Sequence, residues 1–312
     1  KIVVATEPEE IPRLHTLFER GNQNGLTGLK MLGADAIRER EPKARGLEAV
    51  LVPEEGIVDY PAVMRNMESK IAGAGGTIHL ASGVRKMTRV DKVWEIETAS
   101  GHFSADFVVG CAGLQADRVS RMTGENPEAK IVPFRGEYFK LKKDREHLVR
   151  HLIYPVPDPR IPFLGVHFTR LAVGGVEAGP NAVLAFAREG YKKSDVNLCD
   201  LGESLSFPGL WRFIKKYPGT TFDELRRSFF KSVFCRSLQR LVPEVQLADL
   251  EPGGAGVRAQ LMSREGELVQ DFYLLDGPGS LHVLNAPSPA ATASLAIGEE
   301  IAERVSQNLL RI

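Results

Sequence analysis

The chain has 312 residues with 40 basic and 40 acidic side chains, so its formal net charge is zero. This balance gives no general attraction to nucleic acid or to an anionic membrane, and no apolar run reaches the roughly 18 residues of a membrane span. Three cysteines without C-x-x-C spacing favour a reducing compartment and argue against a disulfide framework or a zinc site. We therefore expect no metal.

The first quarter of the chain alternates strands and helices. "KIVVA" (1–5) is typical of a strand, and the next segment has capping-box spacing between Thr6 and Glu9, followed by an apolar stripe that ends at Gly21. Further patterns predict a helix at 35–40, a strand at 46–53, and a helix that begins near Tyr60 and Pro61.

Residues 76–113 are the most regularly patterned part of the chain. Four strands are predicted in close succession, at 76–81, 84–90, 93–99 and 102–113, with "DK" and "SG" as turns between them. "GAGG" (73–76) precedes them and is assigned to a helix C-cap, because a dinucleotide fingerprint needs the opposite order of strand and helix. A helix followed by antiparallel strands indicates a β-meander crossover rather than a simple Rossmann repeat.

The second half mixes strands and helices. Strand patterns dominate 131–190, helical patterns dominate 203–242, and a strand at 281–284 leads into a closing helix. The helical part carries a stripe that runs from Leu225 to Leu238. The fold class is therefore α/β with α+β character, in two intertwined domains that are each built from discontinuous segments.

Two segments have the character of anion-binding or nucleotide-binding turns. "NAPSPAATASLAIG" (285–298) places small residues, with Pro289, at a helix start, where free N–H groups attract anions. Close helix packing explains the same residues equally well. "FVVGCAG" (107–113) is a buried-looking strand that ends in glycines, as at nucleotide sites, or else a tight turn. Cys111 in it is expected to be a small buried residue rather than a nucleophile.

Three charged or titratable residues are candidates for substrate chemistry. Arg258 lies among glycines in "GGAGVRAQ", expected to be a loop before a strand, and suits a carboxylate or a structural ion pair. Arg135 and His167 lie in apolar strands, where a charged group needs a partner. Histidine suits proton transfer near neutrality, although a strand histidine is more often a satisfied core residue.

The order of several motifs resembles one enzyme family. "FVVGCAGL", "IVPFRGEY", "IYPVPD", "GPNAVLAF", "AGVRAQ" and "NAPSPAATASLAIG" follow one another as in the L-2-hydroxyglutarate oxidase/dehydrogenase family. These are FAD enzymes of the D-amino-acid-oxidase-like, or glycine-oxidase-like, group. The resemblance runs from Lys1 to about Val305.

The resemblance implies an FAD-dependent oxidoreductase that converts L-2-hydroxyglutarate to 2-oxoglutarate. It places Arg258 on the α-carboxylate. The chemistry of this reaction then assigns His167 to the base or hydroxyl-orienting role, and Arg135 or Tyr138 to the distal carboxylate. The residues that the resemblance implies for FAD are Val84, Cys111, Ala112, Gly113, Asn285, Ala286, Pro287, Ser288, Ala290, Ala291 and Thr292. A related amine or amino-acid oxidase, or an inactive fragment acting as a scaffold, are the alternative readings.

The resemblance also implies a domain plan. Residues 56–131 and 253–312 are expected to form a Rossmann-like FAD domain, and residues 1–55 and 132–252 a mostly antiparallel substrate domain. Because the family's N-terminal strand–G-x-G-x-x-G–helix is absent, we expect an N-terminally truncated fold that binds FAD weakly or not at all by itself. The expected location is cytoplasmic, with peripheral association with the inner membrane left open, and the electron acceptor is oxygen or a quinone.

Overall fold

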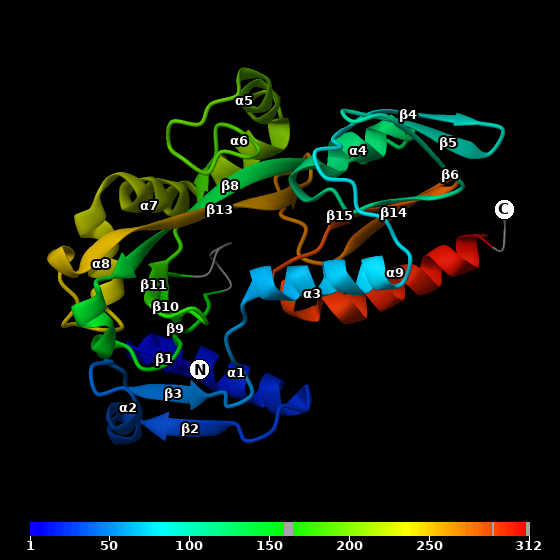
Figure 1. The fold of residues 1–312 in the computed structure, drawn as a ribbon. Helices are drawn as coiled ribbons and strands as arrows, with labels where there is room; N and C mark the ends of the chain where they lie inside the picture. The colour runs from blue at the N-terminus through cyan, green and yellow to red at the C-terminus, as the bar shows by residue number, and fades with distance from the viewer. Residues whose placement is uncertain (159–164, 289, 310–312) are drawn as a thin grey trace. The chain divides into compact units, whose positions relative to one another are not determined.

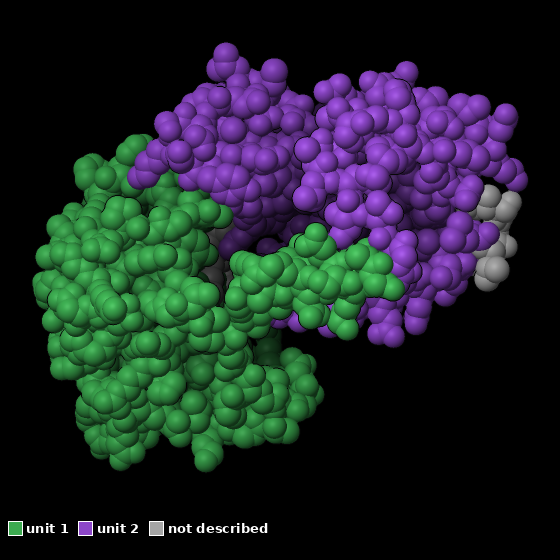
Figure 2. Space-filling model, in the orientation of Figure 1, with its two compact units in different colours: residues 1–73, 135–183, 217–256 green, residues 74–134, 184–216, 257–312 purple. Residues whose placement is uncertain are grey.

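The computed structural model describes residues 1–158, 165–288 and 290–309. The chain divides into two compact units (Figure 2). Unit 1 contains residues 1–73, 135–183 and 217–256, and unit 2 contains residues 74–134, 184–216 and 257–312. Each unit is therefore assembled from three separate stretches of chain, as the interleaved sequence pattern predicted.

Unit 1 is built on a large, mostly antiparallel sheet (Figure 1). Its strand order is β12-β8-β11-β10-β9-β1-β3-β2, with β13 paired to β8. The strands are β1 (Ile2–Ala5), β2 (Lys30–Gly33), β3 (Glu48–Leu51), β8 (Lys130–Leu141), β9 (Ile153–Pro155), β10 (His167–Arg170), β11 (Val176–Gly179), β12 (Val183–Leu184) and β13 (Leu250–Met262). β1 and β9 pair in parallel, although about 150 residues separate Ile2 from its partner Ile153.

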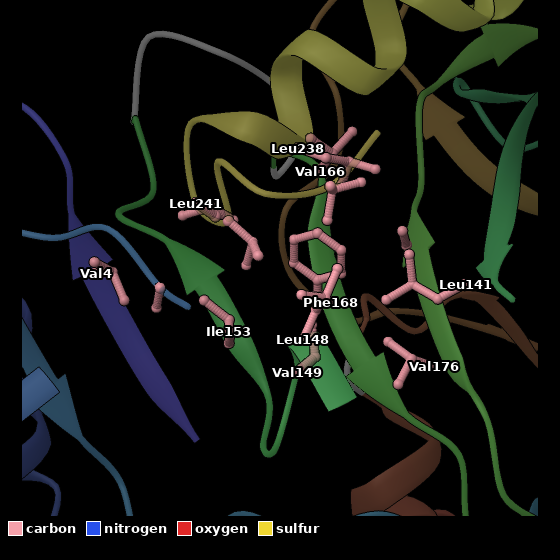
Figure 3. Close-up of a cluster of buried hydrophobic side chains, with 14 of the residues drawn as sticks. Val4, Leu141, Leu148, Val149, Ile153, Val166, Phe168, Val176, Leu238 and Leu241 are labelled. Atoms are coloured by element: carbon pink, nitrogen blue, oxygen red, sulfur yellow. The ribbon is translucent and has the colours of Figure 1, made fainter. Parts of the chain in front are cut away.

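The two faces of this sheet belong to different apolar cores, because side chains alternate along a strand. Ile2 and Val4 of β1 join a cluster with Phe168 and with α8 (Lys231–Gln239), which contributes Phe234 and Leu238 (Figure 3). Val3 and Ala5 point to the other face, where Leu14 of α1 (Ile11–Gln23) covers them. Residues on β9 and β10 therefore divide between a face turned to α8 and the opposite face.

The remaining helices of unit 1 are α2 (Ala34–Arg40), α3 (Tyr60–Gly73) and α7 (Pro218–Phe229). The expected capping box is displaced by one residue, since Glu10 and not Glu9 accepts the Thr6 N–H at 2.7 Å. The prediction that the residues from Leu225 to Leu238 form one apolar surface is also wrong. α7 ends at Phe229, which is 71% exposed, and only the part on α8 is buried.

Unit 2 contains two small sheets. β4 (Val84–Val90), β5 (Val93–Thr98) and β6 (His102–Ala105) form the predicted meander, and Asp91 and Lys92 adopt positive φ in the turn between β4 and β5. β14 (Tyr273–Gly277), β15 (Ser280–Asn285) and β7 (Val108–Gly110) form the second sheet. The helices are α4 (Ala116–Met122), α5 (Leu198–Leu205), α6 (Pro208–Lys216) and α9 (Ser294–Leu309).

Two of the predicted strands need correction. Residues 76–81 lie in turns and irregular backbone rather than in a strand, with Ala81 at φ 54°, and they pair with no described strand. Residues 102–113 do not form one strand. They divide into β6, which completes the meander, and β7, which pairs with β15 in the other sheet.

The parallel pairing of β15 with β7 confirms that residues 281–284 share a sheet with the strand that ends at Gly110. The compact units do not match the expected domains residue for residue, because residues 56–73 group with unit 1 and residues 184–216 with unit 2. The assignment of cofactor and substrate to separate domains stays a prediction.

Candidate active site

The sheet of unit 2 brings two candidate cofactor segments to one edge. In the parallel pair, Ser280 lies opposite Val108 and His282 opposite Gly110. Both strands therefore end on the same side, so residues 111–113 and 286–288 leave the sheet together. Ligands of open α/β sheets bind beside the carboxyl ends of such strands.

The first of these segments is a short turn after β7. Gly113 has φ +50°, a left-handed conformation that favours glycine, and no described atom lies within 4 Å of the position of an added Cβ. A 3₁₀ turn over Gly113–Gln115 then leads into α4. Cys111 is exposed, so its expected burial is wrong: it follows the last residue of β7 and lies outside the packed sheet.

The second segment follows β15. The Asn285 side chain is buried and donates from Nδ2 to the carbonyl oxygens of Val269 at 3.1 Å and Asp271 at 2.7 Å. It therefore fixes the start of the segment through contacts within the protein. Residues 290–293 form a 3₁₀ turn and α9 begins only at Ser294, later than expected, while Pro289 lies outside the described residues.

These two segments fit a dinucleotide such as FAD. Ala286, Ser288 and Ala291 are exposed and small, so a ligand can approach the backbone between Asn285 and α9. Gly113 leaves the facing turn equally open. Val84, the remaining cofactor candidate, begins β4 and is 37% exposed.

A buried ion network stabilises the turn that follows β7. Arg188 is 2% exposed and donates to both carboxylate oxygens of Asp117, the first-turn acid of α4, and to the Leu114 carbonyl oxygen at 2.6 Å. Arg118 joins Asp200 at 2.6 Å and Glu203 at 2.9 Å. Desolvation raises the pKa of Asp117, but the hydrogen bonds and charge of Arg188 outweigh it and hold that pKa below its ordinary value.

His282 is a second buried group beneath the same turn. Its imidazole is 1% exposed, and Nε2 lies 2.8 Å from Thr123 Oγ1, whose proton is donated to the Ser120 carbonyl oxygen. Nε2–H is therefore the donor, and Nδ1 is left without a hydrogen-bond partner among the described residues. Burial lowers the pKa of His282, because the charged form loses its hydration.

Two of the candidate substrate residues of unit 1, His167 and Tyr138, lie on the sheet face opposite α8. Phe168 points to the α8 cluster, so its neighbour His167 points away from it. Gly179 is the cross-strand partner of His167, and Tyr138 Cδ1 lies 3.0 Å from the position of an added Cβ on Gly179. Because residue 179 is glycine, no side chain lies between His167 and Tyr138 on this face of the sheet.

His167 is oriented by two contacts. Its Nδ1 lies 3.0 Å from the Gly165 carbonyl oxygen, so Nδ1 carries the proton as the donor and Nε2 keeps the lone pair. Its ring stacks on Tyr154, with centroids 4.0 Å apart and an interplanar angle of 21°. Part of the motif before it, residues 163–164, lies outside the described residues.

Arg135 lies on the other face of β8. It is 5% exposed and its guanidinium Nη2 donates to Glu137 Oε1 at 3.0 Å. Glu137 also accepts from the Ser228 hydroxyl of α7 at 2.7 Å, which places this pair against the helices. The structure thus brings Tyr138 and His167 to one sheet face and Arg135 to the opposite one.

Arg258 lies within β13 rather than in the loop that glycines suggested, because the whole of "GGAGVRAQ" belongs to that strand. Ala259 and Leu261 pack into a cluster with Ile131 and Leu284, so Arg258 points away from that cluster and is exposed. The substrate role of Arg258 stays a prediction.

Tyr154, Arg188 and His282 were not found by sequence reasoning. The sequence does contain a signal for Arg188, because an arginine beside apolar residues, as in "AFAREGY", indicates a buried partner. In the described part of the chain there is no group of three or more His, Cys, Asp or Glu side chains that could hold a metal. Nor does any described helix have the length and apolar character to cross a membrane.

Comparison with known proteins places this geometry in a class. The family model described as "FAD dependent oxidoreductase" matches residues 1–304. The solved FAD-bound L-alpha-glycerophosphate oxidase from Mycoplasma pneumoniae has the same fold, with a TM-score of 0.76 at 16% identity over 98% of this chain and 72% of that chain. The chain belongs to this FAD-dependent oxidoreductase family, and its cofactor is FAD.

Sequence relatives narrow the class. The chain is 51% identical over 304 residues to "L-2-hydroxyglutarate dehydrogenase" of Indibacter alkaliphilus, covering 97% of this chain and 76% of that protein. It is 45% identical over 311 residues to "L-2-hydroxyglutarate dehydrogenase, mitochondrial" of Caenorhabditis elegans, covering 96% and 72%.

Proposed function

We propose that this protein oxidises L-2-hydroxyglutarate to 2-oxoglutarate, with FAD as the hydride acceptor. The observation that carries the proposal is the 51% identity to a named L-2-hydroxyglutarate dehydrogenase over 97% of the chain. The flavin supplies an acceptor for the hydride from Cα. The protein must then bind two carboxylates, orient the hydroxyl group and remove its proton.

Arg258 is assigned to the α-carboxylate. Its guanidinium is exposed on β13 and offers two parallel N–H donors, which match the two oxygens of a carboxylate. Fixing both oxygens limits rotation of the carboxylate and so orients the adjoining Cα. A lysine at this position would supply charge without that orientation.

His167 is assigned to the hydroxyl proton. The Gly165 carbonyl oxygen fixes Nδ1 as the donor, which leaves Nε2 as the acceptor for the proton of a substrate hydroxyl. His167 is half-buried on the sheet face opposite the α8 cluster, while Phe168 anchors the strand in the core. Hydroxyl deprotonation and loss of the Cα hydrogen together give the 2-oxo acid.

Tyr138 is assigned to the distal carboxylate, because it shares the sheet face of His167 across Gly179. Arg135 was the alternative, but it lies on the opposite face in its pair with Glu137. We accordingly give Arg135 the task of holding β8 and leave the hydroxyl of Tyr138 as the donor. Unit 2 is proposed to bind FAD, and unit 1 to contribute the substrate residues Tyr138 and His167.

The test is anaerobic reduction of the flavin-loaded protein, followed by the loss of flavin absorbance. L-2-hydroxyglutarate should bleach the flavin, whereas its D enantiomer, glycine and L-glutamate should not. Faster bleaching by an amino acid would replace the proposal with an amine or amino-acid oxidase. Re-oxidation by oxygen and by a soluble quinone, compared in the same sample, would identify the electron acceptor.

A further inference from the structure

We propose that Tyr154 is a positioning residue for the reaction, and that it acts by holding the imidazole of His167 in the orientation needed for proton transfer. The inference rests on the proposed function, because it takes His167 as the base. The sequence motifs do not indicate which residue orients the His167 imidazole. The three observations that carry it are the ring stack, the hydrogen bond on the far side of the imidazole, and the way in which Tyr154 is itself fixed.

The stack follows from the sheet. β9 and β10 are antiparallel neighbours with Phe168 opposite Ile153, so His167 lies opposite Tyr154 on the same face. The ring centroids are 4.0 Å apart and the planes differ by only 21°, which restricts tilting of the imidazole out of the stack.

The hydrogen bond fixes the remaining freedom. Nδ1 of His167 lies 3.0 Å from the Gly165 carbonyl oxygen, which prevents the ring from turning over within the stack. Stack and hydrogen bond together leave Nε2 at a defined position. A proton acceptor that is held in place costs no reorganisation when substrate arrives.

Tyr154 is itself held on several sides. Its ring packs against the cluster beneath α1, and its hydroxyl lies 3.4 Å from Thr169 Oγ1. The ammonium of Lys1 lies 4.4 Å from its ring centroid and 2.9 Å from Glu55. Burial raises the pKa of Tyr154, so the phenol stays neutral at physiological pH. A fixed, neutral ring is a suitable platform for an imidazole whose charge changes during the reaction.

The experiment compares Tyr154→Phe and Tyr154→Leu in the flavin-loaded protein. Phenylalanine keeps the ring and should leave kcat within about twofold, whereas leucine should lower kcat roughly three- to tenfold with KM nearly unchanged, the range expected for loss of one aromatic pair. Tyr191→Leu, at an exposed tyrosine that takes no part in the site, is the control for mutation as such.

A second readout does not depend on turnover. NMR spectra should show altered His167 ring signals in Tyr154→Leu, and nearly wild-type signals in Tyr154→Phe. Unchanged His167 signals in Tyr154→Leu would overturn the inference, whatever the activity. A loss of melting temperature without any change in His167 would reduce Tyr154 to a packing residue.

A double-mutant cycle separates this inference from the proposed function. In a His167→Gln background, Tyr154→Leu should cause no further loss of kcat, because the group that it positions is gone. An equal loss in both backgrounds would overturn the positioning role alone. Wild-type kcat in His167→Gln would instead remove His167 as the base and the inference with it.

Discussion

The imidazole of His282 occupies the space that a side chain on Gly110 would need. A Cβ built on Gly110 would lie 2.2 Å from Nδ1 of His282, far inside van der Waals contact. The two residues are cross-strand partners, with Gly110 at the end of β7 and His282 within β15. Glycine at 110 is therefore required by the packing of one buried ring rather than by backbone conformation.

Gly110→Ala should destabilise the protein by about 1–3 kcal/mol, the usual cost of overpacking a close contact. Replacing His282 by alanine in the same chain should recover part of this loss, because it removes the clashing ring. Unfolding in urea of the single and double variants measures the coupling. If the stability losses of the two single variants simply add in the double variant, the His282 ring is not what excludes a side chain at residue 110.

The buried His282 should also make stability fall in mild acid. Burial lowers its folded pKa below the ordinary value of 6.5. As the pH falls below 6.5, the unfolded chain takes up a proton that the folded protein refuses, so the free energy of unfolding decreases towards the folded pKa. His282→Gln should flatten this slope between pH 8 and pH 5, and an unchanged slope would assign it to other groups.

Removing Arg188 should be costly because it strands a buried carboxylate. Arg188→Met leaves Asp117 with only the more distant and partly exposed Arg121 as an ion partner, and the expected loss is about 3–5 kcal/mol at pH 7. Asp117 has a depressed pKa, so its contribution is present above its ordinary pKa of 3.8 and is lost as the pH falls through the folded value. The deficit of Arg188→Met should accordingly shrink on acidification.

Arg121→Met is the matched control for Arg188→Met. Arg121 reaches the same Asp117 carboxylate at 3.5 Å, but its side chain is 36% exposed, so its loss should cost no more than about 1 kcal/mol. Urea denaturation at pH 7 compares the two variants. Similar losses would mean that burial of Arg188 does not set the strength of its ion pair.

Arg258→Lys tests the carboxylate assignment. Lysine keeps the charge but loses the two-pronged donor, so kcat/KM for L-2-hydroxyglutarate should fall roughly thirty- to a thousandfold, with bound flavin unchanged. Arg264→Lys, at an exposed arginine beyond the end of β13, is the control. If Arg258 is a structural ion pair instead, melting temperature and flavin retention should fall while kcat and KM of the remaining enzyme persist.

Local patterns predicted the elements whose cause is local. The meander at 84–105 follows from alternating side chains and the Asp91–Lys92 turn. The prediction of a strand at 76–81 is wrong, because alternation of polar and apolar residues specifies only which side chains share a face. A strand also needs a partner, and no described strand pairs with it.

The site was harder to predict, because its contacts join residues distant in sequence. Arg188 and Asp117 are 71 residues apart, and neither position alone shows that the two are buried together. The same holds for Tyr154 and His167, which meet only because β9 and β10 are neighbours. The motif around His167 made this residue a candidate, but the sequence did not indicate that the ring of Tyr154 stacks on it.

The pairing of β1 has a consequence for synthesis on the ribosome. β1 can pair with β3 as soon as the segment up to Leu51 has emerged, but its other edge waits for β9, whose partner residue is Ile153. Until then an apolar strand, "IVVA", has an unpaired edge, which is a template for association with other chains. Translation pauses that hold the nascent chain between these lengths should therefore increase chaperone engagement and aggregation.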